Sequence, residues 1–89
     1  MKNITPEKYK KYFSTNNLDG YIVLRIYDIP SEKILMASVI PEDGTIMDGS
    51  LYLVDKTTKQ GNFIDGPIGN SLINISKTVW THPEVPKNL

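Results

Sequence analysis

Apolar and polar residues alternate along several stretches of this chain, and the alternation predicts more strand than helix. The first such stretch spans residues 21–27. One face of this strand would carry the aliphatic residues Ile22, Leu24 and Ile26, and the other face Tyr21, Val23, Arg25 and Tyr27. A strand with two different faces is typical of a half-buried antiparallel sheet.

Two β-hairpins follow from the same pattern. A bend at residues 28–32 separates the first strand from a second aliphatic stretch at residues 33–40, which predicts one hairpin. Residues 51–64 contain an apolar run, a polar bend after Asp55 and a second short apolar run, which predicts another hairpin. The residues between the hairpins, 41–49, are acidic and rich in turn formers, and we expect a loop there.

The chain begins with a helix signal. Thr5 precedes a proline and a glutamate, a combination that favours a helix start with the threonine hydroxyl as its cap. The helix should cover residues 6–14. Tyr9, Tyr12 and Phe13 have the i, i+3, i+4 spacing of one helical face, and we expect this face to pack on the sheet.

The pattern in the last third of the chain allows more than one interpretation. Residues 65–70 contain two glycines and a proline and predict a loop. Residues 71–80 allow two interpretations: a strand, because β-branched residues are frequent, or a helix, because Leu72, Ile75 and Val79 share a helical face. We favour the strand. Two prolines in residues 81–89 predict an irregular tail with His82 exposed to solvent.

These elements together predict one α+β domain over residues 1–80, with the tail following it. One N-terminal helix would pack on an antiparallel sheet of four to five strands. A chain of 89 residues has room for one hydrophobic core.

The amino-acid composition indicates the cellular compartment and limits the kinds of binding partner. The chain has no cysteine, which is unusual for a small secreted domain, and its first dozen residues lack the apolar run of a signal peptide. We therefore expect a cytoplasmic protein that does not interact with a membrane. Ten acidic and ten basic residues cancel, which argues against binding nucleic acid through its phosphates.

Candidate catalytic chemistry is sparse. A zinc or di-metal site needs several histidines, cysteines or clustered carboxylates, whereas His82 is the chain's single histidine. The serines lie in no nucleophile motif. We therefore expect a protein that is not an enzyme, with no metal and no cofactor.

Two candidate binding sites remain. Seven acids fall between residues 17 and 55, and we expect some of them to form an acidic contact with a basic protein partner, unless they are merely solvated turn residues. The proposed contact residues are Glu42, Asp43 and Asp48, with Tyr21, Arg25 and Tyr27 as anchors. The alternative is a small, nucleotide-like anion held at the glycine-rich loop; its residues would be Gly66, Gly69, Asn70 and Lys77.

The second hairpin also resembles a known family. A strand ending in Val54-Asp55-Lys56-Thr57 precedes a polar turn, a short strand and Gly66-Pro67. Over residues 50–70 this arrangement resembles small bacterial immunity proteins of the YrhB-like type. The resemblance implies an inhibitor without enzymatic activity that binds a toxin. A phage protein that blocks a bacterial defence enzyme would meet the same physical requirements, and an oligomeric small-molecule sponge or sensor is the alternative.

Overall fold

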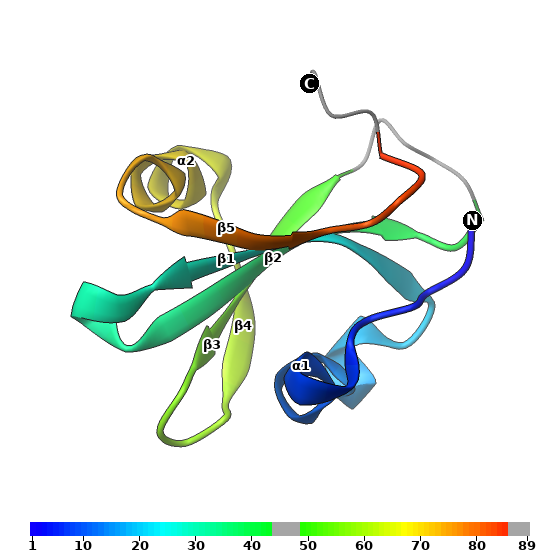
Figure 1. Ribbon diagram of the computed structural model, residues 1–89, viewed down its shortest axis with the longest axis horizontal. Coiled ribbons are helices and arrows are strands. Elements are labelled where there is room, and N and C mark those ends of the chain that lie inside the picture. Colours follow the sequence, from blue (N-terminus) through cyan, green and yellow to red (C-terminus); the bar gives the residue numbers. More distant parts are fainter. Residues whose placement is uncertain (44–48, 86–89) are drawn as a thin grey trace.

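The computed structural model of this chain describes residues 1–43 and 49–85. Its centre is a five-stranded antiparallel sheet with the strand order β4-β3-β2-β1-β5, shown in Figure 1. The strands are β1 Tyr21–Ile29, β2 Ile34–Pro41, β3 Ser50–Asp55, β4 Gly61–Ile64 and β5 Lys77–Thr81. Four consecutive strands form a meander, and β5 returns to pair with β1. Both predicted hairpins are confirmed.

Two α-helices lie on opposite faces of this sheet (Figure 1). They are α1 Glu7–Phe13 and α2 Gly66–Asn74, and two single-turn 3-10 helices, η1 Asn16–Leu18 and η2 Pro30–Glu32, flank β1. The α+β class with an N-terminal helix on the sheet is confirmed. No helix among residues 1–43 and 49–85 is both long enough and apolar enough to cross a bilayer.

The prediction of a loop followed by a strand is wrong for residues 66–74, which form α2, and correct for residues 77–80, which belong to β5; this strand includes Thr81, which was assigned to the irregular tail. Pro67 lies in the first turn of α2, where a missing N–H costs no hydrogen bond. Leu72 and Ile73 pack against the sheet. Burial of this helical face outweighs the β propensity of its branched residues, because tertiary packing supplies most of the stability of short helices.

A β-bulge at Leu24 divides β1 into two parts with different orientation. Val23 pairs with Val39, but Arg25 pairs with Ser38, so Leu24 is an extra residue in the ladder. An extra residue turns every following side chain to the other face. The prediction that Tyr21, Val23, Arg25 and Tyr27 share one face is therefore wrong: the first two lie on the α1 face, and the last two on the α2 face.

The two faces carry separate core clusters. The larger cluster, on the α1 side, comprises Phe13, Leu18, Val23, Ile26, Leu35, Ala37, Val39, Tyr52 and Val54, with Tyr9 and Tyr12 packed against it. The smaller cluster, on the α2 side, comprises Tyr27, Ile29 and Met36, with Leu51, Ile64, Leu72 and Ile73 packed against it. The aromatic face expected for the N-terminal helix does contact the core. The opposite face of the sheet is covered by α2.

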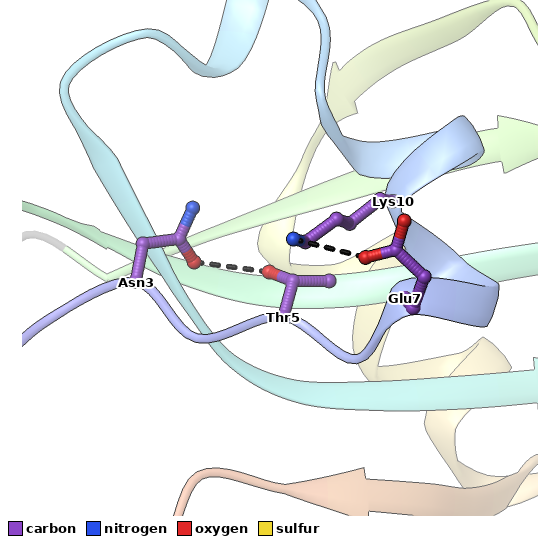
Figure 2. Close-up of polar contacts among 4 residues, drawn as sticks. All are labelled: Asn3, Thr5, Glu7 and Lys10. Carbon is purple, nitrogen blue, oxygen red and sulfur yellow. Dashed lines mark hydrogen bonds and ion pairs between the residues drawn. The ribbon is translucent and has the colours of Figure 1, made fainter.

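The N-terminal segment is held by side-chain hydrogen bonds that differ from the predicted cap. The Thr5 hydroxyl donates to Asn3 Oδ1 at 3.0 Å, and Glu7 pairs with Lys10 at 3.1 Å within α1 (Figure 2). Asn3 Oδ1 also accepts from the Val23 N–H at 3.3 Å. The prediction that Thr5 caps α1 is wrong, because the helix has no side-chain cap and Thr5 instead attaches the segment to β1 through Asn3.

His82 is not exposed, contrary to prediction, and only 2% of its surface is accessible. Its backbone N–H donates to the Leu24 carbonyl at 2.7 Å. Its Nδ1 accepts from the Glu84 N–H at 3.1 Å, and its Nε2 lies 2.8 Å from the Lys2 carbonyl oxygen. Because Nδ1 is an acceptor, Nε2 carries the proton and donates to Lys2. The imidazole thus joins residues near both ends of the described chain.

Candidate functional site

The predicted candidate residues are distributed between two ends of the sheet. We call one end of the sheet the Tyr21 end. It contains the first residues of β1 and β3 and the last residues of β2 and β4. The opposite end of the sheet is called the Asp28 end. There Asp28 of β1 pairs with Leu35 of β2 and with Lys77 of β5. The candidate functional features gather at the Tyr21 end, on both sides of the sheet.

Acidic side chains occupy the turns of the Tyr21 end. The Glu42 N–H donates to the Gly20 carbonyl at 2.8 Å, and this bond places the β2 terminus beside the turn that precedes β1. Gly20 has φ +81°, a conformation that glycine adopts without strain. Asp19, Glu42 and Asp43 are all exposed. The third predicted acid, Asp48, lies outside the described residues.

Asp19 is a member of this acidic group that the sequence did not single out. Asp19, Tyr21 and Glu42 line a common cleft of about 250 Å³, and no lysine or arginine of the described part of the chain lines it. The available signal was its position in the turn that precedes the strand predicted at residues 21–27. Its proximity to Glu42 depends on the pairing of β1 with β2, which brings residues about twenty positions apart side by side.

A pair of aromatic rings lies near the acids. The rings of Tyr21 and Phe63 have centroids 5.4 Å apart and are tilted by 48°. Phe63 also meets the buried Tyr52 edge-on at 5.1 Å. Phe63 is 42% exposed on the edge strand β4, so its ring is supported on one side and accessible on the other. Sequence analysis did not identify Phe63 as a candidate.

A larger cavity of about 560 Å³ lies where β4 leads into α2. Its lining includes the aromatic residues Tyr21, Tyr27 and Phe63 and the polar residues Ser38 and Asn70. Tyr21 lines both this cavity and the acidic cleft. The two candidate sites predicted from the sequence therefore meet at one residue.

The predicted small-molecule residues are only partly brought together. Gly66 and Asn70 line the 560 Å³ cavity. Gly69 is buried, and a β-carbon on it would lie 2.1 Å from Leu51 Cδ1, so Gly69 permits α2 to approach β3. Lys77 is exposed and pairs with Asp28 at the opposite end. The glycine-rich segment is thus the first turns of a packed helix.

The predicted protein-binding anchors also differ in position. Tyr21 is half-buried beside the acids, whereas Tyr27 is 7% exposed and belongs to the core on the α2 side. Arg25 is half-buried on β1 opposite Ser38. Of the three anchors, Tyr21 alone lies next to Glu42, because the bulge at Leu24 directs the other two to the other face.

No group of three or more histidine, aspartate or glutamate side chains close enough to hold a metal ion occurs within residues 1–43 and 49–85. The Tyr21 end therefore offers three kinds of contact: carboxylates, accessible aromatic surface and a partly polar cavity. Comparison with protein-family models, with curated proteins and with solved structures yields no significant match to this chain.

Proposed function

We propose that this protein is a cytoplasmic inhibitor that works by binding and blocking a protein partner. The supporting observation is the juxtaposition, at the Tyr21 end, of exposed acids with the accessible Tyr21–Phe63 ring pair. Aromatic residues are enriched in the buried centre of protein interfaces, and acids around them would accelerate association with a basic surface.

The partner is a toxin or defence enzyme that presents basic residues. This part of the proposal combines the carboxylates of Asp19, Glu42 and Asp43 with the resemblance of residues 50–70 to YrhB-like immunity proteins. An immunity protein or a phage anti-defence protein would occupy a basic active site with such a surface.

Charge reversal tests the proposal. The variant Glu42→Lys/Asp43→Lys should lose a partner that the wild-type protein captures from its native cell, because like charges then face each other. The control, Glu32→Lys, changes an exposed glutamate near the Asp28 end and should keep the partner. The purified partner's own activity is then measured with each variant.

Two results would contradict this function. One is equal capture by the wild-type and Glu42→Lys/Asp43→Lys proteins when both have the same melting temperature. The other is full activity of the captured partner at a saturating amount of wild-type protein.

A second candidate function is binding of a small molecule, as a homo-oligomeric sponge or sensor. The specific observation in its favour is the 560 Å³ cavity, since ligand pockets have volumes of roughly 300–1,000 Å³. Ligand binding raises the melting temperature by mass action, so a thermal-shift screen tests it directly.

A further inference from the structure

We propose that the 560 Å³ cavity binds the neutral heteroaromatic ring of a nucleobase or nucleoside, and not the phosphate of a nucleotide. This inference rests on the second candidate function and names its ligand class. Four features of the cavity carry it: its aromatic lining, an unpaired hydroxyl, an adjacent amide and the charge of the residues around it.

The aromatic lining suits a flat ligand. Tyr21 and Phe63, whose ring centroids are 5.4 Å apart, both line it, with Phe63 42% exposed, and the buried Tyr27 lines it as well. Leu51, Ile64 and Ile73 complete its apolar surface. Any nucleobase can stack on an aromatic side chain, because every base has a π face.

The polar groups of the lining suit a ligand that both donates and accepts hydrogen bonds. Ser38 lines the cavity from the central strand β2, and among the described residues its Oγ is buried without a hydrogen-bond partner. A buried hydroxyl normally has a partner. Asn70, on α2, lines the same cavity and has a side-chain amide that offers two donors and an acceptor. The exocyclic groups and ring nitrogens of a base match this set.

The charges around the cavity argue against a phosphate. Among residues 1–43 and 49–85, no lysine, arginine, histidine, aspartate or glutamate lines it. Arg25 lies opposite Ser38 on β1 but is not part of the lining. The start of α2 is a poor anion site as well, because Pro67 lacks an N–H and Asp65 precedes the helix as its N-cap residue. A phosphate there would face a carboxylate of the same charge.

The test measures binding of adenosine, guanosine, cytidine and uridine, and of the matching 5′-monophosphates, by calorimetry at millimolar ligand. We expect at least one nucleoside to bind, and its monophosphate to bind no more tightly. Ser38→Ala and Asn70→Ala should each weaken nucleoside binding about fivefold or more. Ser31→Ala, at an exposed serine of η2, and Asn74→Ala, at the exposed end of α2, should leave binding unchanged.

The outcomes separate this inference from the function on which it rests. If only the monophosphates bind, small-molecule binding stands and the neutral-ring inference is wrong. If neither class binds, the inference is also wrong. Binding that Ser38→Ala and Asn70→Ala leave unchanged would overturn the assignment to this cavity. Amide chemical-shift changes in the wild-type protein check the location independently: they should centre on residues lining the cavity, and changes confined elsewhere would contradict it.

Discussion

At the scale of single residues, His82 has the most consequential position. Its ring joins Lys2 to Glu84 through both nitrogens, while its own N–H is bonded to Leu24 in the bulge of β1. Replacing His82 with alanine would leave the Lys2 carbonyl and the Glu84 N–H without their partners and remove a buried ring. We expect His82→Ala to lower the free energy of unfolding by about 2–4 kcal/mol, measured by urea denaturation.

The control for this prediction is Glu84→Gln. It retains the backbone N–H that His82 accepts and alters only an exposed side chain, so unfolding should change by less than about 0.5 kcal/mol. A His82→Ala protein as stable as Glu84→Gln would mean that the imidazole bonds contribute nothing net to stability.

Individual residues also show which contacts could be predicted from the sequence and which could not. The aromatic face of α1 was predictable because Tyr9, Tyr12 and Phe13 are neighbours along one helix. Thr5 and His82 were predicted wrongly because local context favoured a cap and an exposed tail. The Thr5 hydroxyl bonds to Asn3, which accepts from the Val23 N–H, and His82 bonds to the Lys2 carbonyl. One sequence does not reveal the long-range pairings of Asn3 with Val23 and of His82 with Lys2.

At the scale of elements, α2 depends on a close approach to β3. A β-carbon on Gly69 would lie 2.1 Å from Leu51 Cδ1 and 3.4 Å from Ile64 Cδ1, so Leu51 would have to change rotamer or the helix would have to move outward. We expect Gly69→Ala to lower the free energy of unfolding by about 1–3 kcal/mol, measured by thermal or urea denaturation.

Gly66 provides a matched control in the same helix. No atom of residues 1–43 or 49–85 beyond its own neighbourhood lies within 4 Å of a β-carbon placed there, and alanine favours helix more than glycine does. Gly66→Ala should therefore leave stability unchanged or raise it by up to about 1 kcal/mol. If both variants behaved alike, tight packing of α2 on β3 would not be the reason for glycine at position 69.

The pairing of neighbouring strands was the most predictable feature of this fold. The face of the sheet on which each side chain lies was the least predictable. Both hairpins follow from local alternation and turn residues. The bulge at Leu24 has no such signal, because the sequence of residues 21–27 alternates without interruption, yet the bulge decides that Tyr21 and Arg25 face opposite helices. The three predicted anchors therefore do not share one face of the sheet. For α2, glycine and proline suggested a loop although proline is compatible with a first helical turn.

At the scale of the whole molecule, the acidic middle of the sequence separates into two groups. Asp19, Glu42 and Asp43 lie at the Tyr21 end, whereas Asp28 and Asp55 lie at the other end of β1 and β3. There Lys56 forms an ion pair with Asp28, which compensates charge at that end. The acidic contact surface that we propose is the Tyr21 end, where the exposed Asp19 and Glu42 line one cleft.

This separation leads to a prediction about association rates with the basic partner. At low salt, Glu42→Gln should slow association several-fold, because exposed charges near an interface mainly steer the encounter. Glu32→Gln removes the same charge from an exposed glutamate of η2 and should change the rate less. The difference between them should shrink as salt rises from about 0.01 M to 1 M, where the screening length falls from about 30 Å to 3 Å. Surface plasmon resonance at several salt concentrations measures these rates, and equal slowing by both variants would assign steering to net charge instead of the Tyr21 end.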